Sequence, residues 1–390
     1  MIVGIADRLN QLKEYYFSVK LAEVRKLHEE TGDVINMGVG SPDLPPSPNT
    51  IEALIETARN PDSHGYQPYK GITPLRNAMT NWYQSTYGVE LDPEKNILPL
   101  MGSKEGITHI SLAFLNATDQ VLVPALGYPA YRAVTQMVGG KVREYPLDPE
   151  TWHPDLDALA SQDLSDVKLM WVNYPHMPSG SAATRSLFEK IVDFAREKQI
   201  LIINDNPYSL ILNEGDPLSL MAVPGAFECC LELNSMSKSH NMAGWRVGMV
   251  VGASDYLSTI LKVKSNVDSG MFMGIQKAAV EAYKNLPQWH QDQNKIYRDR
   301  RNVVFKFLDR LECTYHKDQT GLFVWARVPD QLKSVEELVD HILYKYHLFI
   351  TPGFVFGSPG DRFIRISLCN RKEVLQEALS RIDQFNYQEL

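Results

Sequence analysis

A lysine and an arginine lie eight residues apart in the stretch SMSKSHNMAGWRVG, residues 235–248. The hydroxyl groups of Ser235 and Ser237 precede Lys238, and apolar runs with strand character flank the stretch on both sides. A lysine amine can condense with a carbonyl carbon, and an arginine among hydroxyl groups can bind an anion such as phosphate. The stretch therefore predicts a bound anion that lies next to a reactive amine.

A carboxylate and a phenol follow another apolar run, in ILIINDNPYSL. Burial of Asp205 there is costly unless the acid faces a cationic partner, although a helix cap or loop acid is the commoner explanation for such a residue alone. Tyr208 follows three residues later. In MGSKEG, the turn of Gly102 and Ser103 precedes a predicted helix, and the free N–H groups of a helix start can bind phosphate.

Together these groups predict a site for an anionic aromatic cofactor that is held by an amine. Pyridoxal phosphate has these properties, because its aldehyde condenses with a lysine, its phosphate binds arginine and N–H groups, and its ring nitrogen binds a carboxylate. We therefore predict that the chain binds pyridoxal phosphate through Lys238, Arg246 and Asp205.

The elements that must position these groups are strands and helices in alternation. Short apolar runs rich in branched residues predict strands, and residues 184–199 have the periodicity of a helix. Such alternation predicts a parallel sheet with helices on both faces, in which ligands bind beyond the carboxyl ends of the strands. The predicted strands cover residues 120–124, 167–175, 200–208, 229–235 and 247–252.

The chain divides into two predicted domains. At 390 residues and 44.2 kDa it is too long for one simple core. After about residue 285 the alternation of strand and helix gives way to a long charged helix and then to the runs GLFVWARV and FIRISLC. We expect an α/β fold, with a large cofactor-binding domain over residues 46–285 and a smaller α+β domain formed by residues 1–45 with 286–390.

Charge and composition exclude some classes of partner. The formal net charge of −8 argues against nucleic acid and anionic membranes, which bind basic patches. No apolar run reaches the roughly 18 residues that a membrane span requires. The four cysteines form no C-x-x-C pair, which fits a reducing compartment. We expect a cytoplasmic protein that binds no metal and acts on a small molecule.

Seven motifs, in the order of a known family, extend over nearly the whole chain. They are MGVGSPD, GYQPYKGITPLR, MGSKEG, NYPHMPSG, DNPY, SMSKSHNMAGWRVG and RFIRIS. On these motifs the chain resembles the fold-type I pyridoxal-phosphate aminotransferases of class I/II, among them the bacterial aspartate and LL-diaminopimelate aminotransferases. The resemblance implies the fold of that family and a homodimer with shared active sites.

The resemblance assigns catalytic roles to three residues. Lys238 matches the Schiff-base lysine, Asp205 the acid that pairs with the ring nitrogen, and Tyr208 the phenol that donates to the cofactor's O3′ oxygen. Arg246 matches the arginine that binds the phosphate. The other residues that the resemblance places around the cofactor phosphate are Gly102, Ser103, Lys104, Ser235 and Ser237.

The resemblance also assigns contacts to the substrate and to a partner subunit. Tyr128 matches the aromatic residue that stacks over the ring and borders the substrate, and Tyr66 the tyrosine that reaches the partner subunit's phosphate. Arg365 matches the arginine that binds the α-carboxylate, and Gly40 lies in the loop that closes over the substrate. Lys104 matches a lysine that contacts the distal carboxylate in bacterial aspartate aminotransferases.

One position departs from the family pattern. The family reads N-P-T-G where this chain reads M-P-S-G, and Met177 cannot donate the hydrogen bond that the family's asparagine gives to O3′. Either His176 replaces that donor or Tyr208 serves O3′ alone, with Asn173 as a further candidate. We expect altered pH behaviour and retained activity.

The resemblance implies a ping-pong aminotransferase in which Lys238 moves the Cα proton and Arg365 fixes the α-carboxylate. We predict aspartate and glutamate as amino donors, because Lys104 suits a distal carboxylate, and a 2-oxo acid such as 2-oxoglutarate as acceptor. The alternative is an LL-diaminopimelate or N-succinyldiaminopimelate aminotransferase of lysine biosynthesis. A C–S lyase or other lyase on the same fold, or a non-enzymatic regulator domain, agrees less well with Arg365 and the acidic charge.

Overall fold

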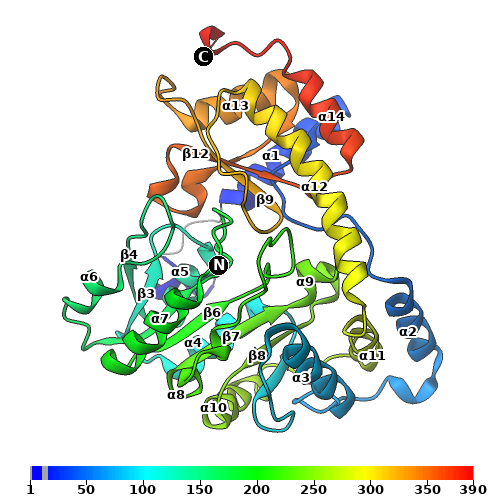
Figure 1. The fold of residues 1–390 in the computed structure, drawn as a ribbon, viewed down its shortest axis with the longest axis vertical. Coiled ribbons are helices and arrows are strands. Elements are labelled where there is room, and N and C mark those ends of the chain that lie inside the picture. The colour runs from blue at the N-terminus through cyan, green and yellow to red at the C-terminus, as the bar shows by residue number, and fades with distance from the viewer. Residues whose placement is uncertain (1, 11–15, 390) are drawn as a thin grey trace.

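The computed structural model describes residues 2–10 and 16–389 and has two parts (Figure 1). One part holds a large sheet with helices on both faces. The other holds two small sheets and the last helices of the chain. The long helix α12 (Pro287–Arg310) runs from the first part to the second.

The large sheet has the strand order β2-β8-β7-β6-β5-β3-β4. Neighbours from β4 to β7 are parallel, and β8 is antiparallel to both β7 and β2. A parallel return needs a crossover helix, and the connection from β7 to β8 contains only short helical turns. The strands are β2 (Ile97–Leu100), β3 (Gln120–Pro124), β4 (Lys141–Tyr145), β5 (Val167–Val172), β6 (Leu201–Asp205), β7 (Cys230–Ser235) and β8 (Gly248–Val251).

Successive side chains of these strands face opposite sides of the sheet, so each face has its own core. In β5, Leu169 and Trp171 belong to one hydrophobic cluster, whereas Met170 and Val172 belong to the other. The helices on the Leu169 face are α4 (Ser103–Phe114), α5 (Pro129–Met137) and α10 (Ser254–Lys264). Those on the Met170 face are α3 (Thr73–Tyr87), α6 (Leu156–Ala160), α7 (Arg185–Lys198), α8 (Ala226–Cys229) and α11 (Met273–Ala282), against which α2 (Pro48–Arg59) packs.

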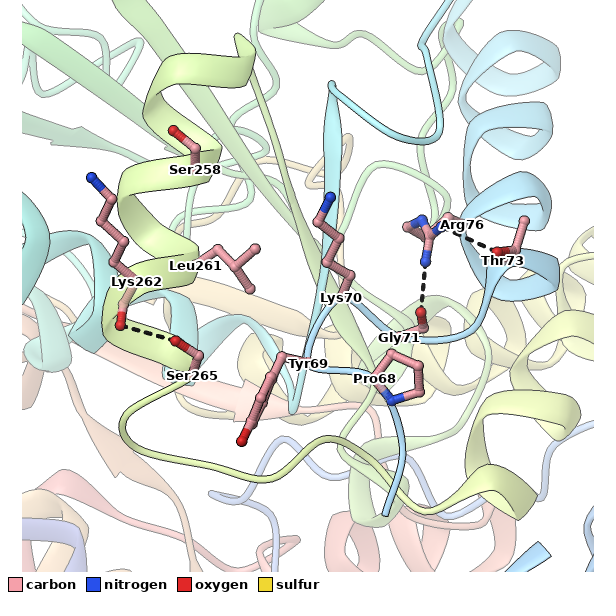
Figure 2. Close-up of a pocket in the computed structure, with 10 residues that line it drawn as sticks. All are labelled: Pro68, Tyr69, Lys70, Gly71, Thr73, Arg76, Ser258, Leu261, Lys262 and Ser265. Carbon is pink, nitrogen blue, oxygen red and sulfur yellow. Dashed lines mark hydrogen bonds between the residues drawn. The ribbon is translucent and has the colours of Figure 1, made fainter. Parts of the chain in front are cut away.

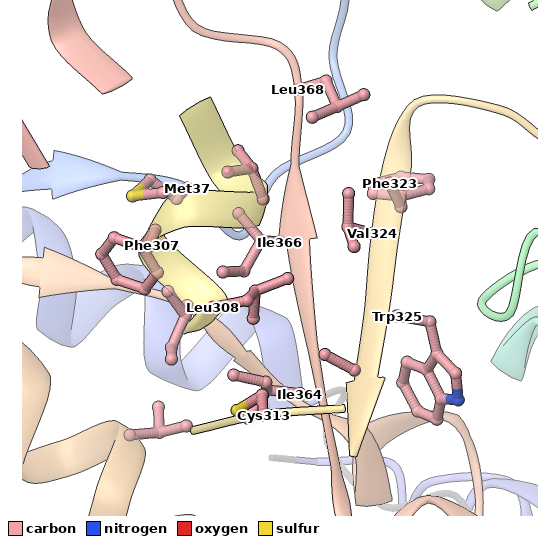
Figure 3. Close-up of a cluster of buried hydrophobic side chains, with 14 of the residues drawn as sticks. Met37, Phe307, Leu308, Cys313, Phe323, Val324, Trp325, Ile364, Ile366 and Leu368 are labelled. Atoms are coloured by element: carbon pink, nitrogen blue, oxygen red, sulfur yellow. The ribbon is translucent and has the colours of Figure 1, made fainter. Parts of the chain in front are cut away.

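The second part is built on an antiparallel sheet with the order β11-β12-β9. Figure 3 shows its core, in which Phe307 and Leu308 of α12 pack against Ile364 and Ile366 of β12. The elements are α1 (Tyr16–Thr31), β1 (Ile35–Asn36), β9 (Phe323–Arg327), α13 (Val335–Tyr346), β10 (Leu348–Phe349), β11 (Thr351–Pro352), β12 (Phe363–Ser367) and α14 (Lys372–Arg381).

The N-terminal segment joins this second part, because β1 pairs in parallel with β10. The α/β class and the mostly parallel sheet between helices are confirmed. The domain boundaries at residues 46 and 286 stay a prediction. None of the helices in residues 2–10 and 16–389 combines the length and the apolar character that a membrane span requires.

Candidate active site

A cavity of about 570 Å³ lies where the carboxyl ends of β5, β6 and β7 face the second part of the molecule. This is the place where α/β sheets bind ligands. Most of the residues that the sequence analysis selected gather there. The selected residues that line the cavity are Gly40, Ser103, Lys104, Tyr128, Asp205, Tyr208, Ser235, Ser237, Lys238, Arg246 and Arg365.

Lys238 lies in the short helix α9 (Met236–Ser239) directly after β7. The Ser235 hydroxyl accepts a hydrogen bond from the Ser237 N–H at 3.1 Å and so caps this helix. The Lys238 ammonium donates to the Gly40 carbonyl oxygen. Burial lowers the pKa of Lys238, and the charges of Arg365 and Arg246 lower it further. A lysine with a lowered pKa supplies the neutral amine that acts as nucleophile and base.

Asp205 ends strand β6 and is buried. Burial raises the pKa of its carboxyl to about 7, and a hydrogen bond from the Tyr131 hydroxyl to Oδ2 (2.9 Å) opposes that rise. Its other oxygen, Oδ1, is buried and has no hydrogen-bond partner among the described residues. An acid in this state suits a cationic N–H donor in the cavity, such as the protonated ring nitrogen of pyridoxal phosphate.

Arg246 faces the turn at the start of α4. Its Nη1 donates to the Ser237 hydroxyl at 3.3 Å and to the Ala243 carbonyl oxygen at 3.0 Å. Gly102 has φ 86° and ψ 156°, and a Cβ built on it would lie 2.1 Å from Arg246 Nη2. A side chain at residue 102 would displace the guanidinium, so the glycine lets the arginine and the helix start approach each other closely enough to share one anion. This arrangement fits a phosphate group.

A polar cluster of Glu105, His109 and Asp268 lies behind that turn, and no motif in the sequence indicated it. Glu105 Oε2 accepts from the Met101 N–H at 2.6 Å, and Glu105 Oε1 lies 3.1 Å from His109 Nε2. Asp268 closes the cluster and pairs with Lys264 at 2.5 Å. Glu105, His109 and Asp268 have the ligand types of a metal site, but the Lys264 ammonium already supplies a cation next to Asp268.

Arg365 projects from β12 into the opposite side of the cavity. Its guanidinium carbon lies 3.8 Å from the centroid of the Phe323 ring and 4.5 Å from that of Phe356. Nη2 donates to the Gly38 carbonyl oxygen at 2.8 Å, and Nη1 lies 3.5 Å from the Met177 sulfur. Aromatic surroundings and fixed hydrogen bonds orient the planar fork that binds a carboxylate through two N–H groups.

The turn after β5 holds His176 and Asn173, two candidates for the hydrogen-bond donor to O3′ that Met177 cannot supply. Both ring nitrogens of His176 have partners outside the cavity, the Ser179 hydroxyl at 2.7 Å and the Leu126 carbonyl oxygen at 3.1 Å. The Asn173 amide donates to the Asp205 carbonyl oxygen and accepts from the Met177 N–H. His176 therefore does not replace the family's asparagine.

Tyr208 lines the cavity and stays the predicted donor to O3′. Burial raises its pKa well above the ordinary range, and the charge of Arg365 opposes that rise. Tyr208 therefore keeps its proton and can donate a hydrogen bond. Tyr128 lies against Tyr131 edge to face, with ring centroids 5.7 Å apart. Tyr66 does not line the cavity, and 93% of it is exposed.

A larger cavity, of about 690 Å³, lies between the loop before α3 and helix α10 (Figure 2). Lys70 and Lys262 line it, but its lining contains no carboxylate. The Arg76 guanidinium donates to the Gly71 carbonyl oxygen at 2.6 Å and to the Thr73 hydroxyl at 3.2 Å, as the dashed lines show. The candidate active site is therefore the smaller cavity, where a lysine, an acid and two arginines meet.

Comparison with known proteins agrees with this geometry. The family model described as aminotransferase class I and II matches residues 32–382. The chain belongs to this family of aminotransferases. Its members transfer amino groups and use pyridoxal phosphate, so the predicted enzyme class and cofactor are confirmed, and a lyase or regulator domain is not supported.

Relatives within this aminotransferase family differ in their named substrates. The LL-diaminopimelate aminotransferase of Oleidesulfovibrio alaskensis is 40% identical over 385 residues, which cover 97% of this chain and 98% of that protein. Apo-BacF from Bacillus subtilis has a TM-score of 0.94 and 33% identity, covering 98% of each chain. A probable N-succinyldiaminopimelate aminotransferase from Thermus thermophilus has a TM-score of 0.87 and 31% identity, covering 94% of this chain and 99% of that one.

Proposed function

We propose that this aminotransferase takes LL-diaminopimelate as amino donor and a 2-oxo acid as acceptor. The observation that carries the proposal is the meeting of Lys238, Asp205 and Arg365 in one cavity. The substrate rests on the 40% identical relative with that name, together with the apolar wall described below. This reading was the alternative in the sequence analysis, and it has more support than aspartate and glutamate.

Each residue has a defined task in amino transfer. Pyridoxal phosphate, when bound, accepts electrons from the Cα of an amino acid joined to it. Arg246, Ser237 and the turn at Gly102 would hold the phosphate, and Asp205 would hold a proton at the ring nitrogen. Lys238 Nζ removes the substrate's Cα proton and later returns it, because burial favours its neutral form.

Helix α1 forms an apolar wall of the cavity, and this wall favours a substrate with a long side chain. Phe17 and Leu21 of this helix line the cavity, and the Phe17 ring centroid lies 5.7 Å from the guanidinium carbon of Arg365. Lys20, on the same helix, forms an ion pair with Asp340 at 2.6 Å and so fixes α1 to α13. A substrate held at its α-carboxylate therefore places its side chain beside an apolar wall, which suits methylene groups.

Aspartate or glutamate is the second candidate, and Lys104 favours it. This lysine lines the cavity, is exposed, and has no ion-pair partner among the residues that the structure describes. A free ammonium at the cavity can attract a distal carboxylate, whether the side chain is short or long. Lys104 thus serves both candidates, whereas the apolar wall of Phe17 and Leu21 favours the longer substrate.

The proposed homodimer rests on Tyr66 and on its neighbourhood. Tyr66 is 93% exposed, and Val267 is 62% exposed. The two segments lie together, because a Cβ on Gly270 would come within 2.7 Å of the Gln67 carbonyl oxygen. Exposed apolar side chains that gather in this way favour association with a second copy. A cytoplasmic location stays a proposal.

A half-reaction screen tests the substrate proposal. Purified protein loaded with pyridoxal phosphate is mixed with one amino acid at a time, without an oxo acid, and the absorbance of the lysine-bound cofactor is followed. We expect LL-diaminopimelate to bleach this band faster than aspartate does. Faster bleaching by aspartate would favour the second candidate, and bleaching by neither would contradict both.

A further inference from the structure

Glu232 is a buried acid that the proposed mechanism does not use. It lies in the middle of β7 and is 0% exposed. Burial raises the pKa of Glu232, and the groups that oppose this rise are neutral hydrogen-bond donors, namely Ser219, Asn204, Leu220 and Tyr83. An uncompensated acid in such a place is costly, so the fold must hold it by other means.

Four hydrogen bonds hold this carboxylate. Oε1 accepts from the Tyr83 hydroxyl at 3.0 Å and the Ser219 hydroxyl at 2.6 Å. Oε2 accepts from Asn204 Nδ2 at 2.9 Å and the Leu220 N–H at 2.9 Å. Asn204 cannot turn its oxygen toward the acid, because its Oδ1 accepts from the Tyr174 N–H at 2.9 Å. The Asn204 amide and the Leu220 N–H can only donate, so they cannot accept a hydrogen bond from a protonated acid. These donors therefore favour the ionised form of Glu232.

The carboxylate lies directly beside the strand end that carries Asp205. Asn204 of β6 is opposite Glu232 in the sheet, and the next residue, Asp205, is opposite Leu233. The hydrogen bond to Asn204 therefore fixes the backbone that aims Asp205 into the cavity. The negative charge of Glu232 also acts on Asp205 across the two paired strands, because both groups are buried and a buried pair is screened little.

We propose that Glu232 is a positioning residue for Asp205, and that its negative charge helps to keep a proton at the ring nitrogen of bound pyridoxal phosphate. The inference rests on the role given to Asp205 under the proposed function. A second buried negative charge makes the cavity around Asp205 more favourable for a cation. The ring nitrogen therefore keeps its proton to a higher pH when Glu232 is ionised.

The other titratable groups that face this pair are phenols and a thiol. Tyr131 of α5 and Tyr208 face Asp205, and Tyr83 and Tyr87 of α3 face Glu232. Burial raises the pKa of each of these phenols, so they stay neutral and do not titrate near neutral pH. Cys230 of β7 also lies near Glu232, and its thiol pKa is raised well above the ordinary value by the hydrogen bond with Cys229 and by burial.

Glu232→Gln removes the charge and keeps the shape. The glutamine oxygen can accept from the two N–H donors, and its amide can donate to the hydroxyls of Tyr83 and Ser219, which accept as well as donate. The measurement is the ¹⁵N NMR shift of the ring nitrogen in protein loaded with ¹⁵N-labelled pyridoxal phosphate, followed against pH. We expect the midpoint of ring-nitrogen deprotonation to fall by about one pH unit, a tenfold loss of proton affinity.

Two further variants separate charge from packing. Glu228→Gln is the matched control, because the Glu228 side chain is 63% exposed and pairs with Arg196 on the surface. Tyr83→Phe removes one donor from Glu232 and keeps the negative charge. We expect both variants to keep the midpoint of the unchanged protein.

Three outcomes would overturn the inference or its basis. An equal midpoint in E232Q and the unchanged protein would refute the effect of the charge. A fall in Y83F, which keeps the charge, would assign the effect to packing and would refute the inference even if E232Q does not fold. A ring nitrogen that is neutral in the unchanged protein would instead refute the role of Asp205.

Discussion

Gly102→Ala tests whether the phosphate site depends on the close approach of Arg246 to the helix start. Residue 102 has φ 86° and ψ 156°, a region that only glycine adopts at low cost. An alanine there costs about 1–3 kcal/mol of backbone strain. Its Cβ would lie 2.1 Å from Arg246 Nη2, so the guanidinium must move. Loss of a hydrogen bond to a charged group costs about 1.5–3 kcal/mol, which is about a tenfold to hundredfold loss of cofactor affinity.

The assay is a titration of the apoprotein with pyridoxal phosphate, together with thermal unfolding of the apoprotein. Gly244→Ala is the matched control, because Gly244 lies two residues before Arg246 and a Cβ there meets nothing within 4 Å. We expect weaker cofactor binding and a lower unfolding temperature in G102A, and neither change in G244A. Unchanged cofactor affinity in G102A would refute the phosphate role of this turn.

Three more predictions concern substrate choice and pH. Lys104→Ala should raise KM for dicarboxylic donors far more than for neutral ones, and equal losses would assign Lys104 to the phosphate or the fold. Phe17→Ala should lower kcat/KM for LL-diaminopimelate about tenfold and spare aspartate, and a uniform loss for both donors would contradict the apolar wall. The raised pKa of Asp205, about 7, makes the ionised acid unfavourable in the folded apoprotein, so stability is lost as pH rises from about 4 to 7. Asp205→Asn should therefore stabilise the apoprotein at pH 8 by on the order of 4 kcal/mol, as measured by chemical denaturation, and should weaken cofactor binding, as measured by titration. Equal stability of the two proteins at pH 8 would contradict this prediction.

Much of the candidate site could be predicted from short stretches of the sequence. Lys238 and Arg246 lie in one connection between two strands, so their types and spacing predict their task without knowledge of distant segments. Asp205 was found for the same reason, since it ends an apolar strand. Strand β4 was missed because it lies at the edge of the sheet, where every side chain except that of Tyr145 is half-buried or exposed, and its sequence KVREY has no apolar run.

Contacts between distant segments could not be predicted in this way. Phe17 lies beside Arg365 although 348 residues separate them along the chain (365 minus 17). The donors to Glu232 come from α3, from β6 and from the segment before β7, and no motif joins these segments. The sequence also left His176 open as a donor, and only the turn geometry directs its ring away from the cavity.

We propose that Lys238 holds the cofactor until an amino donor displaces it and that its freed amine then moves the Cα proton. The most direct measurement is reduction of the loaded protein with borohydride, followed by digestion and mass spectrometry of the labelled peptide. We predict the phosphopyridoxyl label on Lys238, and loss of that label when an amino donor is added before reduction. A label on another lysine, or one that an amino donor does not remove, would contradict the account.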